Sequence, residues 1–203
     1  MGPLGQAARH VTGERRILLG IDCSSAHLAL ALVDPELGVL AAGADDVGRA
    51  HAALVIAALD ALFERAGIAP GRVGLIGVGV GPGSYTGVRV GVATATGLGR
   101  AWGVPVAGAS SLVAVAGTRA APGEEVVAVM DARRGNVYAQ RLLRREAGPS
   151  VPTYDELEAP RKLGRAALAA AYPGLRVVEG APPDAAVSAL AAVAGRRVEP
   201  YYL

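Results

Sequence analysis

Three short polar segments of the sequence carry residue types that can bind phosphate or a metal ion. The first is the bend DCSSAH, in which Asp22, Ser24 and Ser25 stand between two apolar runs. Backbone amides and hydroxyls at such a bend can hold a phosphate, and a carboxylate can hold a hydrated metal. The alternative is a polar hairpin turn, which we favour because no glycine-rich phosphate signature follows the bend.

The second segment is GPGSYTG, in which residues 81–84 stand directly before an expected helix and can bring backbone amides to a nucleotide shared with a partner. The third is DARRG, whose Arg133 and Arg134 can contact an anion or an RNA phosphate. Glycine permits a close backbone approach that arginine prevents, so DARRG favours a surface or interface role over catalytic nucleotide turnover. The candidate phosphate contacts are Asp22, Ser24, Gly81, Gly83, Ser84 and Arg133.

Residues suited to metal binding or nucleophilic catalysis are present, but their spacing predicts neither a metal site nor a catalytic residue. The three histidines are far apart, and position 55, one helical turn after His51, is a valine. Ser84 lacks the G-x-S-x-G arrangement, and Cys23 lies in an apolar run with no basic neighbour to lower its pKa. We therefore expect His51 to be structural or interfacial.

We expect two hairpins to position the first and third segments, DCSSAH and DARRG. We expect a strand and the helix after it to position the second segment, GPGSYTG. Alternating apolar and turn residues predict this order of elements. The predicted strands are 17–21, 27–33, 37–44, 73–80, 104–106, 126–130 and 136–142. The predicted helices are 51–66, 85–101 and 110–117, with weaker helical character over 159–172 and 184–194.

Two of these helices carry residues for contact with a partner. The helix over 51–66 is apolar nearly all round, since Asp60 is the only polar side chain between residues 51 and 63. One side can pack on the chain's own sheet, and the other requires a partner. In the helix over 85–101, small residues recur every fourth position and allow a second helix to approach closely. The predicted partner interface comprises His51, Leu54, Val55, Ala58, Leu62, Gly87, Gly91 and Ala95.

Composition and charge limit the class of protein. The 203 residues suit one domain or two small lobes, and a net charge of +2 is too even for a dedicated nucleic-acid binder. The single cysteine excludes a disulfide within the chain. Residues 1–15 lack the apolar core of a signal peptide and are expected to form a disordered extension. The stretch 101–118 is uncharged, but its glycine, proline and serine residues make it less apolar than a membrane-spanning helix. We expect a soluble, cytoplasmic protein without a membrane partner.

Three segments together resemble the TsaB family, the bacterial proteins that take part in making threonylcarbamoyladenosine in tRNA. They are ILLGIDCSSAHLALALVD at 17–34, the stretch from GPGSYTG to GASSL at 81–112, and MDARRGNVYA at 130–139. The terminal VEPYYL adds to the likeness. The resemblance implies an α/β fold of the actin, sugar-kinase and heat-shock ATPase superfamily, with two lobes of mixed sheet flanked by helices. We expect residues 16–112 to form the first lobe and 113–203 a reduced second lobe whose end packs back on the first.

The same resemblance implies a function. TsaB is the non-catalytic relative of TsaD, which transfers the threonylcarbamoyl group to N6 of the adenosine next to the anticodon in tRNAs that read codons beginning with A. The chain is thus expected to be a scaffold subunit for a TsaD-type transferase, to reach a TsaE-type ATPase and tRNA through the complex, and to self-associate as a homodimer. It requires no cofactor of its own, and ATP or ADP is a candidate at the partner interface. The alternatives are an ATP hydrolase or metallopeptidase-like enzyme of the same superfamily, and a homodimeric regulator without a tRNA role.

Overall fold

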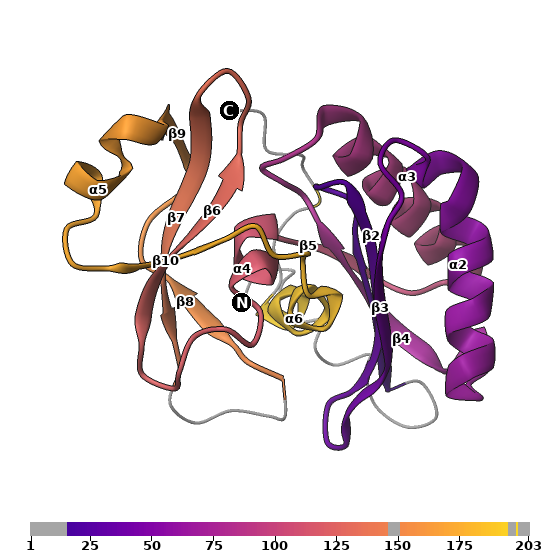
Figure 1. Ribbon diagram of the computed structural model, residues 1–203. Coiled ribbons are helices and arrows are strands. Elements are labelled where there is room, and N and C mark those ends of the chain that lie inside the picture. Colours follow the sequence, from indigo (N-terminus) through magenta and orange to yellow (C-terminus); the bar gives the residue numbers. More distant parts are fainter. Residues whose placement is uncertain (1–15, 146–150, 195–197, 199–203) are drawn as a thin grey trace.

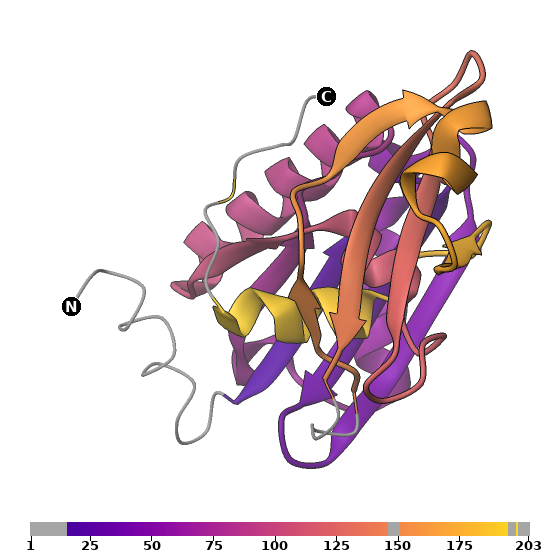
Figure 2. The same ribbon diagram turned by 90° about the vertical axis from the view of Figure 1, so that its left-hand side faces the viewer.

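The strands of the protein form two separate sheets with helices between and around them. The computed structural model describes residues 16–145, 151–194 and 198. The first sheet has the strand order β3-β2-β1-β4-β5, and the second has the order β10-β6-β7-β8, with β9 also paired to β7. Helices α4 and α6 lie between the sheets, whereas α2 and α3 cover the outer face of the first sheet (Figures 1 and 2). The predicted arrangement of two sheets flanked by helices is therefore present.

The first lobe begins with an antiparallel meander, as predicted, and continues with parallel strands. All residues of β1 and β4 are buried, which explains why residues 17–21 and 73–79 are uninterrupted apolar runs. The short fifth strand begins at residue 106, where the predicted strand 104–106 ends. The strands are β1 (Ile17–Asp22), β2 (His27–Asp34), β3 (Gly38–Asp46), β4 (Val73–Gly79) and β5 (Val106–Ala109).

The helices of this lobe start and end close to the predicted residues. α2 ends at Gly67, whose φ of 63° is the left-handed conformation that suits glycine at a helix end. α3 begins after Ser84, as predicted, and α4 begins after Ser110, whose side chain accepts from the Leu112 N–H. None of the described helices combines the length and apolar composition that a bilayer-spanning segment needs. The elements are α2 (His51–Ala66), the 3-10 turn η2 (Pro70–Arg72), α3 (Tyr85–Trp102) and α4 (Ser111–Ala116).

The second lobe contains the predicted hairpin and three further strands that the sequence did not predict. The helix expected over 159–172 is wrong in its first part, because residues 161–164 form β9 and pair antiparallel with residues 136–139 of β7. The free edge of β7 supplies hydrogen bonds that outweigh local helix propensity. The elements are β6 (Glu125–Asp131), β7 (Asn136–Arg144), β8 (Tyr154–Glu156), β9 (Arg161–Gly164), η3 (Arg165–Ala167), α5 (Leu168–Ala171) and β10 (Arg176–Glu179).

The last helix, α6 (Ala185–Ala191), continues into η4 (Ala192–Ala194) and connects the lobes. It is capped by Asp184 and packs against β1 and β4 of the first sheet as well as against α4. A Cβ atom at Gly20 of β1 would lie 1.9 Å from the Ala185 carbonyl oxygen, so only glycine permits this approach. Val198, the one described residue after η4, packs against the first-lobe core. The expected extension 1–15 lies outside the described residues.

Candidate functional site

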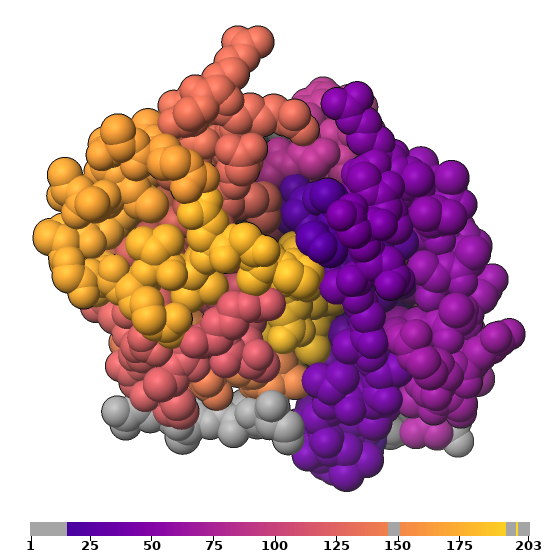
Figure 3. All heavy atoms as spheres, in the orientation of Figure 1, coloured from indigo at the N-terminus to yellow at the C-terminus, as the bar shows by residue number. Residues whose placement is uncertain are grey.

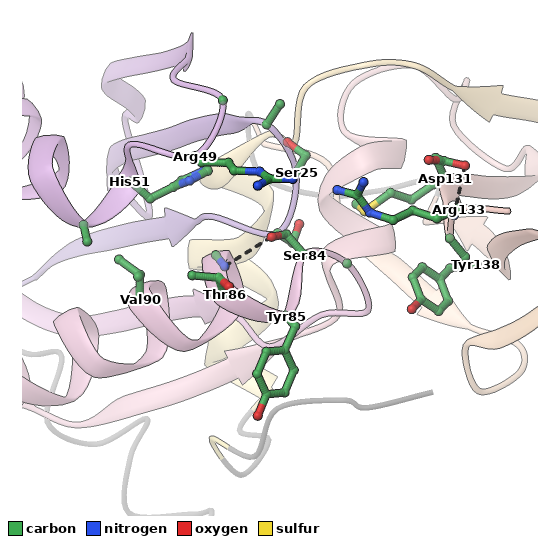
Figure 4. A pocket seen from close by; sticks show the side chains of 18 residues that line it. Ser25, Arg49, His51, Ser84, Tyr85, Thr86, Val90, Asp131, Arg133 and Tyr138 are labelled. Atoms are coloured by element: carbon green, nitrogen blue, oxygen red, sulfur yellow. Dashed lines mark hydrogen bonds between the residues drawn. The ribbon is translucent and has the colours of Figure 1, made fainter.

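A pocket of about 760 Å³ between the two lobes collects most of the candidate phosphate contacts. Its lining comes from the β1–β2 bend, the start of α2, the start of α3 and the β6–β7 turn, and Figure 4 shows these side chains around a common space. Asp22 and Gly81 are not part of the lining. The predicted contacts that line the pocket are Ser24, Gly83, Ser84 and Arg133.

The first turn of α3 is held against the β1–β2 bend. The backbone N–H of Ser84 donates to the Ser24 carbonyl oxygen at 2.6 Å, and the Ser84 Oγ accepts from the Gly87 N–H at 3.3 Å. Ser84 is thus the N-cap of an 18-residue helix. The positive end of the helix dipole therefore faces the pocket, where it favours a negative charge.

Asp22 lies beneath the bend and outside the pocket. Its side chain is completely buried; Oδ1 accepts from the Ser24 N–H at 2.8 Å, while Oδ2 has no hydrogen-bond partner among the described residues. Burial raises the pKa of this carboxyl, although the hydrogen bond from the Ser24 backbone N–H acts in the opposite direction. An unpaired buried oxygen disfavours the charged form. In this structure the Asp22 side chain stabilises the β1–β2 bend through its hydrogen bond to Ser24, and it does not reach the pocket.

The small residues of α3 pack on their own sheet, in contrast to the sequence prediction. A Cβ atom at Gly87 would lie 2.0 Å from the Cys23 carbonyl oxygen, and one at Gly91 would lie 3.5 Å from the Cys23 Sγ. Ala95 is completely buried in the same core. These three residues were predicted to face a partner helix; they instead allow α3 to lie on the end of β1. The Cys23 thiol is buried as expected, and burial raises its pKa to about 12.

The predicted interface on α2 divides between the core and the surface. Val55 and Leu62 are in the first-lobe core, at 3% and 1% exposure, so in the folded chain neither is available to a partner. His51 is also buried, and its Nε2 donates to the His27 carbonyl oxygen at 3.2 Å, which ties the start of α2 to β2. Only Leu54 is exposed, at 42%, with Ala58 half-buried. The helix therefore turns the more bulky of its two apolar faces inward.

The β6–β7 turn has an unusual backbone. Arg133 and Arg134 both have positive φ angles, 62° and 53°, a conformation that residues other than glycine and asparagine seldom adopt. The Arg133 N–H donates to Asp131 Oδ1 at 3.2 Å, and the Arg133 carbonyl oxygen accepts from the Asn136 N–H at 3.0 Å. The turn projects from the surface at the top of the molecule (Figures 1 and 3).

Sequence reasoning missed several residues that line the pocket, among them Arg49, Met130 and Tyr138. Arg49 stands alone in a short loop before α2, with no motif to single it out. Met130 and Tyr138 face each other across the β6–β7 ladder, and the sequence predicted only that both lie in strands. Among the described residues, no three His, Cys, Asp or Glu side chains are grouped as metal ligands would be.

Comparison with known proteins identifies a matching family and several similar proteins. The family described as TsaD, tRNA N6-adenosine threonylcarbamoyltransferase, matches residues 44–157. An uncharacterized protein of Mycobacterium tuberculosis is 33% identical over 186 residues, which cover 90% of this chain and 81% of that protein. The tRNA threonylcarbamoyladenosine biosynthesis protein TsaB of Bacillus subtilis is 34% identical over 121 residues, covering 60% of this chain and 52% of that protein.

Solved structures agree with the fold. YeaZ from Pseudomonas aeruginosa superposes with a TM-score of 0.75 at 24% identity, and the match covers 92% of this chain and 99% of YeaZ. The two mixed sheets with their flanking helices are the fold of the actin, sugar-kinase and heat-shock ATPase type, as the sequence resemblance implied.

Proposed function

Because the chain belongs to the TsaD family of tRNA N6-adenosine threonylcarbamoyltransferases, and to its TsaB branch, we propose that it takes part in threonylcarbamoyladenosine biosynthesis in tRNA. Its role in this proposal is that of a non-catalytic subunit that binds and orders a TsaD-type transferase. The observation that carries the proposal is the outer surface of α2, which is apolar and has no partner within the described chain.

The α2 surface has the composition of a protein contact. Ala53, Leu54, Ala57 and Ala61 follow one another along one side of the helix, and all four are exposed. Ile56 adds a further exposed apolar side chain at 55%. The neighbouring helix α3 has small exposed residues, including Ala93 and Gly97, so a partner can approach the backbone of both helices. Contiguous exposed apolar area of this kind marks interaction sites on soluble proteins.

The proposal is tested by co-purification of the chain with the TsaD-type protein of the same organism. Leu54→Arg places a charge on the exposed face of α2, and we expect it to abolish co-elution while the far-UV circular dichroism spectrum stays unchanged. Leu37→Arg is the matched control, since Leu37 is 70% exposed in the β2–β3 turn, which lies outside α2 and α3. Leu62→Arg does not serve this purpose, because Leu62 is a core residue whose replacement disturbs folding.

A deletion strain supplies the second measurement. We expect the modified nucleoside to fall in tRNAs that read codons beginning with A, and to return with the wild-type gene and with Leu37→Arg but not with Leu54→Arg. Normal modification in the deletion strain, together with failure to co-elute, would refute the proposal.

Further details of the proposal concern the other components. A TsaE-type ATPase and tRNA would meet this chain only through the transferase, in the cytoplasm, and ATP or ADP would bind where the two subunits meet. The same α2 surface suits self-association, so we propose that the isolated chain forms a homodimer that the transferase displaces. Size-exclusion chromatography of the chain with and without the transferase distinguishes the two complexes, and Leu54→Arg should weaken both.

A further inference from the structure

The strand β3 forms one edge of the first sheet, and its outer side is open to another chain. It is the last strand in the order of that sheet, and Figure 1 shows it along this side of the molecule, beside α2. Residues 42–46 are all exposed, and their side chains are short. β3 contains neither a proline nor a lysine, which are residues that protect exposed edges from pairing. The strand is therefore a template for a further strand.

The hydrogen bonds of β3 show which of its backbone groups are available. The Val47 N–H donates to the Ala26 carbonyl oxygen, and in an antiparallel ladder every second residue bonds to the same neighbour. Residues 41, 43 and 45 therefore bond to β2, whereas the N–H and C=O groups of residues 42, 44 and 46 point outward. A contact from α2 agrees with this direction, because Arg65 Nη2 donates to the Ala42 carbonyl oxygen at 3.1 Å.

Opposite charges lie on one face of this edge. The guanidinium of Arg65 is above Gly43, since a Cβ atom on Gly43 would lie 3.5 Å from Arg65 Nη2. Side chains two residues apart in a strand point to the same face, so Asp45 is on this face as well. Within the described part of the chain, neither Arg65 nor Asp45 forms a salt bridge. The edge thus offers a cation and an anion that can pair with another molecule.

The helix α2 extends the same edge with apolar side chains. Helical spacing places Leu54, Ala58 and Ala61 on the side of α2 that carries Arg65. This is the side next to β3, because Arg65 reaches the β3 backbone. Leu54 and Ala61 are exposed and Ala58 is half-buried. The outer side of β3 and this side of α2 therefore form one surface.

We propose that this surface binds a second copy of the chain, with the two β3 strands paired antiparallel across a two-fold axis at Ala44. In this register Gly43 stands opposite the partner's Asp45, and because Gly43 has no side chain the carboxylate can reach Arg65. The two-fold axis repeats this salt bridge. The Ala42 carbonyl oxygen, which Arg65 leaves, then accepts from the backbone N–H of the partner's Asp46.

The surface is self-complementary in each respect, as a two-fold interface requires. Its outward backbone groups, its two charges and the apolar side of α2 all meet their own copies, and the two first sheets become one continuous sheet. The inference rests on the self-association proposed above and gives it a geometry. It does not involve the transferase.

Analytical ultracentrifugation of the full chain over a range of concentrations tests the proposal. Ala44→Pro removes an outward N–H and no bond to β2, so we expect an unchanged circular dichroism spectrum and self-association weakened by about tenfold or more. Co-elution with the TsaD-type protein is expected to survive, because residue 44 lies outside α2 and α3. Loss of the dimer alone thus separates this inference from the proposed function.

A charge exchange tests the predicted salt bridge. Arg65→Glu and Asp45→Arg each place like charges opposite one another twice in the dimer, and each is expected to weaken self-association by about tenfold. The double variant restores opposite charges and is expected to associate within about threefold of the wild type. Asp60→Arg is the matched control, since it reverses an exposed charge on another side of α2 and should leave self-association unchanged.

Cross-linking tests the register. The two Ala44 residues form a hydrogen-bonded pair whose Cα atoms are about 5.5 Å apart, which suits a disulfide. The native Cys23 is buried, so mild oxidation is expected to link Ala44→Cys into a covalent dimer and to leave Gly97→Cys, at an exposed position of α3, as a monomer. Cross-linking of Gly97→Cys without Ala44→Cys would place the contact on the helices and overturn the proposal. A wild type that stays monomeric at every concentration, or an Ala44→Pro variant that associates as tightly as the wild type, would overturn it as well.

Discussion

Replacing Gly87 of α3 by alanine separates two explanations for the small residues of this helix. The added Cβ atom would lie 2.0 Å from the Cys23 carbonyl oxygen, so α3 and the end of β1 must move apart by about 1 Å to restore ordinary contact. Overpacking of this kind costs about 1–3 kcal/mol. Alanine in a helix recovers at most about 1 kcal/mol relative to glycine. We therefore expect Gly87→Ala to lower the free energy of unfolding by up to about 2 kcal/mol.

Gly97 supplies the matched control within the same helix. It is exposed, and a Cβ atom there would meet nothing within 4 Å, so Gly97→Ala is expected to raise the free energy of unfolding by about 0.5–1 kcal/mol. Urea denaturation followed by far-UV circular dichroism, at one protein concentration, measures both variants. If Gly87 instead existed for contact with a partner helix, Gly87→Ala would be as stable as Gly97→Ala and would lose only association. That outcome would refute the packing argument.

The remaining predictions concern the core and the buried polar groups. Leu62→Ala should lower the free energy of unfolding by about 2–5 kcal/mol, whereas Leu54→Ala should change it by about 0.5 kcal/mol or less; similar urea midpoints would contradict this assignment of faces. Gln140→Ala should cost about 1–3 kcal/mol, because the buried Gln140 Oε1 accepts from Ser110 Oγ at 2.6 Å and the hydroxyl hydrogen of Ser110 would lose its acceptor; an unchanged urea midpoint would count against this. The pKa of Asp22 is raised in the folded state, so the folded protein binds the proton more tightly than the unfolded chain does. Protonation of Asp22 therefore stabilises the folded state at low pH, and this stabilisation is lost as the pH rises from about 3.8 through the folded pKa. The stability of Asp22→Asn relative to wild type should therefore increase over that range and then level off, and urea titrations at several pH values that stay parallel would exclude the mechanism.

Much of the first lobe could be predicted from local patterns. Apolar runs such as Ile17–Ile21, the serine before α3 and the glycine after α2 act within a few residues, and the elements that they predict are present with shifts of one or two residues. The second lobe was less predictable, since β9 is a strand only because the edge of β7 is available 25 residues earlier in the chain. The sequence of a short segment does not show which strand will pair with it.

The candidate site shows the same division. GPGSYTG and DARRG attract attention by composition, and Ser24, Gly83, Ser84 and Arg133 do line one pocket. Arg49 has no motif, and only the placement of the first lobe against the second brings it opposite Arg133 (Figure 4). Asp22 looked suited to contact a ligand, yet the bend turns its carboxylate into the interior.

By itself, the sequence determined the order of most elements and the two bends that frame the pocket, because these follow from residue types over short spans. The family and the class of fold came from its resemblance to TsaB proteins. Only the tertiary structure decided which face of each apolar helix is covered. Val55 and Leu54 are adjacent and similar in hydrophobicity, but one points into the sheet and the other outward. The glycines of α3 likewise indicated a close contact but not the residue contacted, which is Cys23 of the same chain. The sequence could not identify that residue, because the contact depends on how elements far apart in the sequence pack together.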